Sequence, residues 1–463
     1  MCGTMDSYTS ASEKERILAD AKKNDVRFVD FEFVDIPGMT KNTEMTTARL
    51  DEALTDGVWF DGSSIEGFVG ISESDMFLIP DSSTYAIQPW TSNSSKTMRL
   101  ICDVYSDENK PFAGDPRGLL KHSLAKAKEQ GYDYKVGPEL EFFIFKGGSS
   151  GCGCPGAAND PESAMVHDAG AYFDNHTRDE ATELRRRIVP AMEAMGLRIE
   201  MSHHEVAPGQ HEIDFRYNNA LVVADSVMTY KTVVRTLAQQ AGLHASFMPK
   251  PVAGINGSGM HVHQSLWKDG KNTFHDSSDP AGLSQTARYY IAGILDHARA
   301  IAAVTNPTVN SYKRLVPGYE APVYVAWGRS NRSALIRIPK VRKGFEAGTR
   351  AEVRFPDPSC NPYLAFSVML AAGLDGIAKK TALPKDQDDN LYHLTPADLA
   401  KRGIKTLPAS LKEAMEELAS DDVLQKALGS HIYDSLSELQ RKDWDAFRTS
   451  VTDWEKNRYF SVL

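Results

Sequence analysis

Three short segments of the chain alternate charged side chains with apolar ones at every second position. They span residues 136–145, 257–263 and 350–355. In a β-strand, residues i and i+2 point to the same face of the sheet. The alternation therefore predicts strands that hold charge on one face, in a lined cavity, and pack apolar side chains on the other. The charged positions are Glu139, Glu141, His261, His263, Arg350, Glu352 and Arg354.

Candidate metal ligands occur in these segments and in one more, between residues 202 and 213. The full set is Glu139, Glu141, Glu205, Glu212, His261 and Glu352. Five carboxylates and one imidazole form an oxygen-rich set that suits Mg²⁺ or Mn²⁺ better than a metal that prefers thiolates. The set is large enough for two ions that share a site. Such pairs typically bind phosphoryl oxygens.

An enzyme that uses a nucleotide also needs groups that bind phosphate, and the chain has neither a Walker A motif nor a Rossmann fingerprint. Metal ions and arginines supply an alternative, because planar guanidinium groups match phosphate and carboxylate oxygens. Arg314 precedes a loop rich in proline and glycine that carries Glu320, and such a loop could close over a site. A single arginine is usually an ordinary ion-pair residue, but several accompany the ligand set. They are Arg314, Arg332, Arg337, Arg350 and Arg354.

Composition narrows the class of protein. The chain has 463 residues, which exceeds one ordinary domain and predicts two. A net charge of −10 and the lack of a dense basic run argue against a nucleic-acid partner. Neither a signal sequence nor an apolar stretch of about 18 residues is present, so we expect a cytoplasmic protein with no membrane partner. The number of cysteines, five, is small and odd, which argues against a disulfide framework.

Local patterns divide the chain near residue 112. The first hundred residues are rich in strand patterns, as in the alternation of residues 29–33. Asp115 then provides a helix N-cap, with proline at the first helical position. We therefore predict an N-terminal domain over residues 1–112 and a second domain over residues 113–463.

Apolar stripes predict helices in the second domain. One covers residues 184–195, where Pro190 should introduce a kink, and another covers residues 223–237. A late stripe recurs at helical spacing in Trp444, Phe447, Val451 and Trp454. We expect this stripe to pack on the body of the protein, with packing on another subunit as the alternative.

Several blocks of the chain resemble type I glutamine synthetases. The resemblance covers nearly the whole chain, from Phe-Asp-Gly-Ser-Ser-Ile at residues 60–65 to the final helical segment. The other matching blocks span residues 137–143, 202–213, 248–251, 256–263, 306–322, 331–333 and 350–357. The resemblance implies an α+β fold with an N-terminal β-grasp domain and a catalytic domain in which helices surround a curved antiparallel sheet. It also implies a homododecamer of two hexameric rings, with active sites between neighbouring subunits.

The resemblance implies a reaction as well. ATP would convert the γ-carboxylate of L-glutamate into γ-glutamyl phosphate, and ammonia would attack this intermediate to give L-glutamine, ADP and phosphate. Two ions of Mg²⁺ or Mn²⁺ would take part. The tighter ion would bind Glu141, Glu205 and Glu212, and the ion that bridges ATP would bind Glu139, His261 and Glu352.

The remaining site residues follow from the same motifs. Arg332 and Arg337 would stabilise the transferred phosphoryl group, and Glu320 would close the site against water. Asp61 of the adjacent subunit would bind ammonium and accept its proton. The set implied for substrate binding is Ser64, Asn256, Gly257, Arg314, Glu320, Arg332 and Arg354. The set implied for ATP is Glu200, His263, Ser265, Arg337 and Arg350.

Departures from the family pattern concern regulation. The short spacing between Glu205 and Glu212 resembles the branch that is not adenylylated, which is found in many Gram-positive bacteria and archaea. Tyr392 stands where the other branch carries its modifiable tyrosine, and we interpret it as a structural residue. Gly70 stands where the branch that responds to feedback carries arginine, so we expect glutamine to inhibit weakly.

Two alternatives remain open. A ligase on the same scaffold could join glutamate to a polyamine or another amine, although such an enzyme should lack the aspartate of Asp61-Gly62-Ser63-Ser64. A non-catalytic homologue is the second alternative, because a fold alone does not establish function. Such a protein should have lost ligands or arginines, and none is missing here.

Overall fold

The structure is a computed structural model that describes residues 9–68, 75–107, 110–147, 166–279, 282–329 and 331–463. Gly70, Cys2, Cys152 and Cys154 lie outside the described residues. Cys102 and Cys360 are buried and free. Within the described ranges, no helix is both long and apolar enough to cross a membrane.

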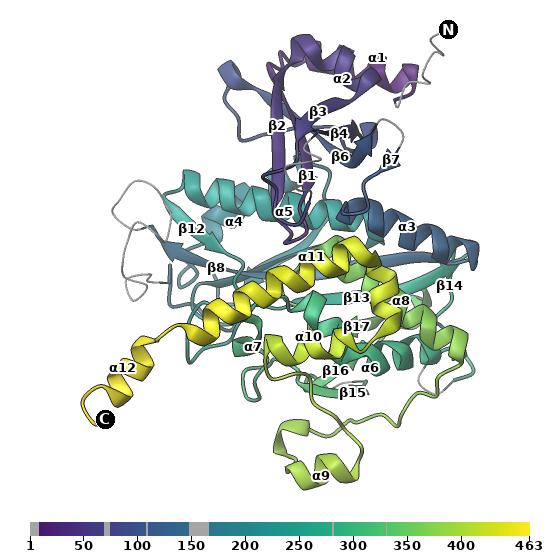
Figure 1. The fold of residues 1–463 in the computed structure, drawn as a ribbon, viewed down its shortest axis with the longest axis vertical. Coiled ribbons are helices and arrows are strands. Elements are labelled where there is room, and N and C mark those ends of the chain that lie inside the picture. Colours follow the sequence, from purple (N-terminus) through teal and green to yellow (C-terminus); the bar gives the residue numbers. More distant parts are fainter. Residues whose placement is uncertain (1–8, 69–74, 108–109, 148–165, 280–281, 330) are drawn as a thin grey trace.

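A mixed sheet forms the N-terminal part of the molecule, at the top of Figure 1. Its strand order is β2-β1-β6-β4-β3, and the pair β1–β6 is parallel. Two helices, α1 (Ala11–Lys23) and α2 (Leu50–Asp56), accompany the sheet, and Ser10 caps α1. Buried side chains of β1 and β6, among them Phe31 and Leu100, form a core with Ile17 and Leu54 of the helices. The strands are β1 (Phe28–Val34), β2 (Thr40–Thr46), β3 (Val58–Asp61), β4 (Asp75–Pro80), β5 (Ala86–Ile87), β6 (Thr97–Asp107) and β7 (Lys110–Pro111).

A second sheet carries the strands predicted from alternating charge. Its order is β15-β16-β17-β13-β8-β10-β9, and its strand pairs are antiparallel apart from β15–β16. Short strands β11 and β12 pair with β8, and β14 pairs with β13. The strands are β8 (Asp133–Lys146), β9 (Ile199–His204), β10 (Gln210–Phe215), β11 (Asn218–Asn219), β12 (Leu243–Ser246), β13 (Met260–Lys268), β14 (Lys271–Asn272), β15 (Tyr324–Gly328), β16 (Ala334–Arg337) and β17 (Ala351–Val353).

Helices surround this sheet and bury its apolar face (Figure 1). Helix α5 packs on β8, and α8 packs on α3, α6 and α11. Close contact between α6 and α8 requires Gly293, because a β-carbon there would collide with the backbone of α8. The helices are α3 (Pro116–Glu129), α4 (Thr182–Ala194), α5 (Ala220–Gln240), α6 (Gln285–Thr305), α7 (Ser311–Arg314), α8 (Pro362–Lys379), α9 (Pro396–Lys401), α10 (Leu411–Ala419), α11 (Asp422–Thr449) and α12 (Asp453–Tyr459). The expected α+β fold is therefore confirmed.

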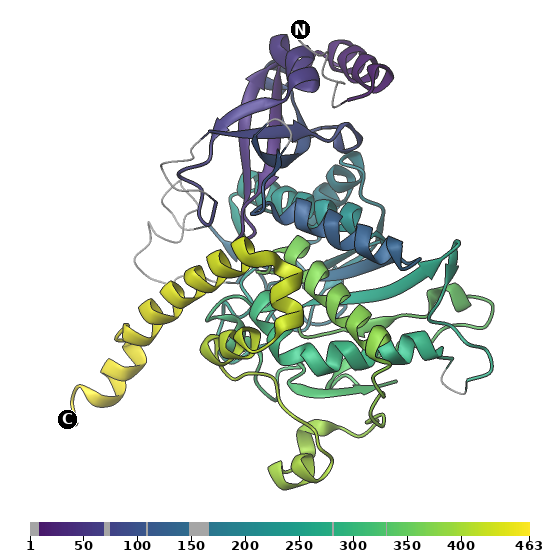
Figure 2. The same ribbon diagram turned by 45° about the vertical axis from the view of Figure 1, so that its right-hand side comes forward.

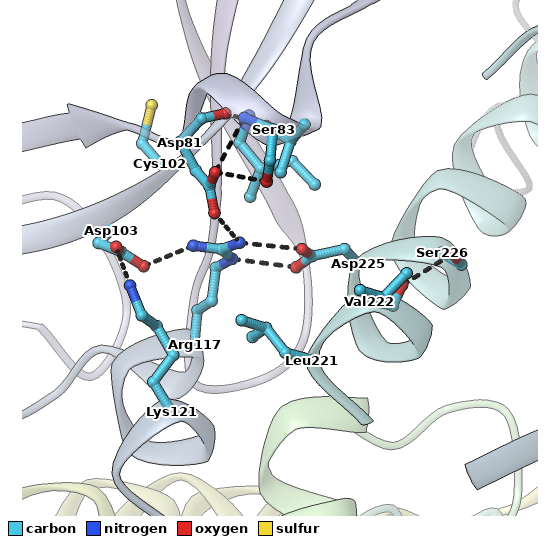
Figure 3. Close-up of polar contacts among 12 residues, drawn as sticks. Asp81, Ser83, Cys102, Asp103, Arg117, Lys121, Leu221, Val222, Asp225 and Ser226 are labelled. Carbon is cyan, nitrogen blue, oxygen red and sulfur yellow. Dashed lines mark hydrogen bonds and ion pairs between the residues drawn. The ribbon is translucent and has the colours of Figure 1, made fainter. Parts of the chain in front are cut away.

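A buried arginine joins the two parts of the molecule. Arg117 is the second residue of α3, two positions after Asp115, which provides the N-cap as predicted. Its guanidinium donates two hydrogen bonds of 3.0 Å to Asp225 on α5. It also bonds Asp81, which directly follows β4, at 2.7 Å, and Asp103 on β6 at 2.6 Å (Figure 3). Because this charge is buried, removal of one partner should be strongly destabilising. The domain boundary at residues 112 and 113 remains a prediction.

A second ion-pair cluster ties α11 to the helices beneath it. The ring of His297, on α6, lies between the carboxylates of Asp421 (2.5 Å) and Asp375 (3.1 Å). Asp421 is also the N-cap of α11. Burial lowers the pKa of His297, but its bonds to the two carboxylates outweigh this and raise the pKa overall.

The C-terminal aromatic stripe does not pack as expected. Trp444 contacts the core, whereas the side chains of Val451 and Trp454 are 68% and 66% exposed. Helix α11 ends at Thr449, and extended backbone at Ser450 separates it from α12. The four residues therefore do not share one helix face. Figures 1 and 2 show the end of α11 and α12 projecting away from the body.

Candidate active site

Neighbouring strands of the second sheet place the candidate ligands side by side. Glu139 on β8 lies opposite His261 on β13, and Glu141 lies opposite Glu212 on β10. Alternate residues of β8, such as Leu140, point into the apolar core and are fully buried. The alternation therefore places charged side chains on one face of the sheet and apolar side chains in the core, as the sequence predicted.

One cavity gathers the metal ligands and most of the substrate residues. Its lining includes every member of the candidate metal set, and Asn256, Gly257, Arg314, Glu320, Arg332, Arg337 and Arg354. These side chains come from separate segments of the chain, brought together by the sheet and by the loops that follow β15 and α7. The cavity is therefore lined by both carboxylates and guanidinium groups.

A second cavity adjoins the first through Glu139, which lines both. Its lining includes Glu200, His263, Ser265 and Arg350, the residues implied for ATP apart from Arg337. Aromatic rings of Tyr217 and Trp267 stack nearby, at 6.4 Å between centroids. The sequence thus predicted a set of residues that the fold does bring together, next to the ligands implied for the ATP-bridging ion.

The carboxylates divide into two groups of close neighbours. Glu139, His263 and Glu352 offer ligand atoms within 4.8 Å of one another, and so do His203, Glu205 and Glu212. His261 lies beside the first group, with Nδ1 3.2 Å from Glu139 and 4.0 Å from Glu352. The first group shares Glu139 and Glu352 with the set implied for the ATP-bridging ion, and the second shares Glu205 and Glu212 with the set implied for the tighter ion. Each group also contains a histidine from outside those sets, and Glu141 belongs to neither group.

Buried negative charge is concentrated at Glu141 and at Glu212, a member of the second group. Burial and the charge of Glu205 raise the pKa of Glu141 to about 8. Burial, with the charges of Asp214 and Glu141, raises the pKa of Glu212 well above its usual range. Buried carboxylates that repel one another are stabilised by a bound cation, and oxygen ligands suit Mg²⁺ and Mn²⁺. The donor set therefore fits a divalent cation.

Arginines compensate the charge of the first group. Glu352 is 1% exposed. It accepts hydrogen bonds from Nε of Arg337 (2.5 Å) and from Nε of Arg354 (3.0 Å). Burial opposes ionisation of Glu139, but the charges and hydrogen bonds of His263 and His261 hold its pKa well below the usual range. This side of the cavity thus combines carboxylates with groups that attract phosphoryl oxygens.

The loop that carries Glu320 contributes to the lining of the first cavity. Glu320 adopts left-handed backbone conformation, with φ of 58°, which is unusual for a residue other than glycine. Asn256 donates a hydrogen bond of 3.3 Å to its carboxylate. The hydroxyl of Tyr392 donates to the carbonyl of the next residue, Ala321, at 2.9 Å. This contact supports the interpretation of Tyr392 as a structural residue.

Asp61 and Ser64 do not join these residues. Neither lines either cavity of its own chain. Asp61 ends β3 in the N-terminal domain, where it is exposed and accepts a hydrogen bond of 2.8 Å from the amide of Ser63. Both side chains are therefore accessible to another molecule.

Sequence reasoning overlooked several residues that line the first cavity or its ligand groups. His203 lies two residues before Glu205, and Gln210 lies two before Glu212, so strand alternation was a signal for both. Gln210 donates a hydrogen bond of 2.9 Å to Glu141. Tyr172 also lines the cavity. No local pattern distinguished this tyrosine, which follows a segment without strand or helix periodicity.

Comparisons with known proteins agree with this geometry. The family described as glutamine synthetase, catalytic domain, matches residues 113–459, and glutamine synthetase, beta-Grasp domain, matches residues 25–107. Proteins named glutamine synthetase are similar to this chain. That of Thermotoga maritima is 52% identical, covering 96% of this chain and 99% of its own. That of Methanocaldococcus jannaschii is 51% identical, covering 96% and 97%.

A solved structure is also similar over its full length. It is titled a GmaS/ADP complex, is 30% identical, and superposes with a TM-score of 0.85 over 96% of this chain and 99% of that one. The extent of these matches, taken with the two adjoining cavities, leads to one conclusion. The chain belongs to the glutamine synthetase family.

Proposed function

We propose that this chain joins ammonium to the γ-carboxylate of L-glutamate in a reaction driven by ATP. The products are L-glutamine, ADP and phosphate, and γ-glutamyl phosphate is the intermediate. One observation carries the proposal. A cavity lined by carboxylate ligands and arginines adjoins, through Glu139, a second cavity that contains the residues implied for ATP.

Two divalent cations, Mg²⁺ or Mn²⁺, fit the ligand set. Glu141, Glu205 and Glu212 would hold one, and Glu139, His261 and Glu352 the other. Bound ions of this kind neutralise phosphate charge and orient phosphoryl oxygens. His203 and His263 lie within the same groups and are further candidates for contact with the ions.

The arginines have separate tasks. Arg332 and Arg337 line the cavity near the carboxylate groups and stabilise the charge of the phosphoryl group in transfer. Arg314 and Arg354, with Asn256 and Gly257, bind glutamate. Glu320 excludes water from the intermediate, and its position in the lining of the cavity supports this role.

Glu200, His263, Ser265, Arg337 and Arg350 bind ATP in this proposal. Arg350 is held in the second cavity by a hydrogen bond of 3.0 Å from its Nε to Nδ1 of His263. A fixed guanidinium is suited to phosphate oxygens.

Assembly completes the proposed site. Asp61 and Ser64 serve the neighbouring subunit, where Asp61 binds ammonium and accepts its proton. Both residues are exposed and lie outside the linings of the two cavities of their own chain, which supports this role. We propose a homododecamer of two hexameric rings in the cytoplasm, and the exposed apolar residues of α12 provide surface for contact between subunits.

The ligase that uses another amine is not favoured, because relatives at about 50% identity are named glutamine synthetase. Release of phosphate should be measured with ATP, glutamate and either ammonium or a panel of amines. The proposal predicts the highest kcat/KM with ammonium. A higher kcat/KM with an organic amine would refute it.

A further inference from the structure

The face of β9 and β10 that points away from the cavity carries a buried charged cluster. His204 on β9 and His211 on β10 lie directly opposite each other in the antiparallel register. Both are fully buried, and their rings pack edge to face with centroids 4.8 Å apart. The neighbouring residues, Glu205 and Glu212, point to the cavity instead. The two histidines therefore lie directly behind two of the candidate metal ligands.

Hydrogen bonds fix the ring of His204 at both nitrogens. Nε2 lies 2.9 Å from Oδ1 of Asp168, and Nδ1 lies 2.6 Å from the carbonyl oxygen of Glu205. Both of these oxygens are acceptors, so each nitrogen donates and the ring is an imidazolium. Its charge is paired with the buried Asp168. The imidazolium therefore holds the backbone of Glu205 directly.

Asp168 connects two segments that line the cavity. Its Oδ1 also accepts the amide of Gly209 (2.8 Å) and the amide of Gly170 (3.2 Å). Gly209 belongs to the turn between β9 and β10, whose ends are closed by a hydrogen bond of 2.7 Å from the amide of Glu205 to the carbonyl of Gln210. Gly170 begins the segment that reaches Tyr172. One carboxylate oxygen thus fixes the turn that carries Glu205 relative to a second wall of the cavity.

The rest of the cluster balances its charge. Arg185 on α4 pairs with Asp179 at 2.5 Å and lies 2.9 Å from Nδ1 of His211. Because the guanidinium only donates, Nδ1 of His211 accepts and the ring is neutral, with its proton on Nε2. Asp168 and Asp179 are therefore matched by His204 and Arg185. Such a neutral, buried arrangement is rigid, because loss of one member leaves another charge uncompensated.

We propose that His204 and Asp168 are positioning residues that set the place of Glu205, and through the turn that of Glu212, for cation binding. The inference rests on the metal site proposed above. Groups that orient metal ligands from behind typically change metal affinity by about 10-fold to 100-fold when they are altered. The bond from His204 to the Glu205 carbonyl is the contact on which this effect depends.

Two substitutions of His204 separate this contact from the rest of the cluster. In His204→Asn the amide nitrogen occupies the place of Nδ1 and keeps the bond to Glu205. In His204→Gln it occupies the place of Nε2 and keeps the bond to Asp168 only. Both variants lose the same charge, so both should lose stability. We expect His204→Gln to bind Mn²⁺ at its tighter site about 10-fold more weakly than His204→Asn.

The Mn²⁺ affinity of each variant is measured on the assembled protein without nucleotide, from the electron paramagnetic resonance signal of the Mn²⁺ that stays unbound. Equal Mn²⁺ affinity in the two variants, whether at the level of the unaltered protein or below it, would overturn the proposal. If either variant does not fold, Gly170→Ala takes its place, because a β-carbon there would meet Nε2 of His204 at 2.5 Å and displace the ring. The same weakening is expected, and unchanged affinity would refute the proposal.

Two controls identify the source of a negative result. Asp225→Asn removes a buried carboxylate that pairs with Arg117, outside the metal site, and should lower stability without a change in Mn²⁺ affinity. Glu212→Gln removes a proposed ligand and should abolish the tighter site. Retention of that site in Glu212→Gln would refute the metal assignment itself. Loss of the site there, with equal affinity in the two His204 variants, would refute only the positioning role.

Discussion

Replacement of Glu352 by glutamine should strongly reduce the kcat/KM of glutamine formation while the shape of the side chain is kept. The carboxylate accepts a hydrogen bond from Arg337 at one oxygen and from Arg354 at the other. In Glu352→Gln one of these oxygens becomes an NH₂ group that faces a guanidinium N–H, so one arginine loses its partner in either rotamer. Loss of one charge-assisted hydrogen bond costs about 1.5–3 kcal/mol.

The variant also loses a charged ligand of the proposed metal site. Together with a displaced arginine, this loss should raise the barrier by about 4 kcal/mol, which corresponds to roughly a 1,000-fold fall in kcat/KM. Initial rates of glutamine formation should be measured across a series of Mg²⁺ concentrations. Glu438→Gln, an exposed substitution on α11, is the matched control. A kcat/KM for Glu352→Gln within 10-fold of the control, at saturating metal, would refute the reasoning.

Three further predictions concern residues outside the metal set. Asp61→Ala should lower the rate of glutamine formation by at least about 100-fold, as expected for loss of a proton acceptor. Calorimetry should find the affinities for ATP and glutamate little changed. Equal losses in the rate and in both affinities would indicate a structural role. Tyr392→Phe should weaken the attachment of the Glu320 loop by about 1 kcal/mol, which raises the fraction of molecules with an open loop roughly fivefold. Because water then reaches the intermediate more often, the ratio of phosphate released to glutamine formed should rise. An unchanged ratio would contradict the anchoring role. The pKa of His297 is higher in the folded than in the unfolded protein, so the stability that it contributes is complete below about pH 6.5 and is lost as the pH rises through the folded pKa. In unfolding by denaturant, His297→Gln should therefore lower the free energy of unfolding more at pH 6 than at pH 9. Equal losses at the two pH values would contradict the ion-pair role.

The sequence was sufficient to predict the charged face of the second sheet. In β8 and β13, charged and apolar residues alternate over several positions, and the strand period alone assigns Glu139 and His261 to one face. The same period applied to His203 and Gln210, which were overlooked because each stands beside another polar residue. The N-cap at Asp115 was likewise a local property of the chain.

Features that depend on tertiary packing could not be predicted from the periodicity of the sequence. The helical spacing of the C-terminal stripe continued past Thr449, where the backbone becomes extended and the helix ends. The cluster around Asp168 unites a loop, two strands and α4, which no periodic pattern connects. In the proposed assembly Asp61 would meet a cavity of the neighbouring subunit, and no periodic pattern within one chain predicts such a contact.

Transfer of oxygen from glutamate to phosphate tests the central claim most directly. Attack of the γ-carboxylate on ATP forms a C–O–P linkage, and attack of ammonia then breaks the C–O bond. The phosphate released must therefore contain one oxygen from glutamate. With γ-carboxylate-¹⁸O-labelled glutamate, ATP and ammonium, ³¹P nuclear magnetic resonance should find one ¹⁸O atom in each inorganic phosphate. Unlabelled phosphate, formed together with glutamine, would contradict the proposed γ-glutamyl phosphate intermediate.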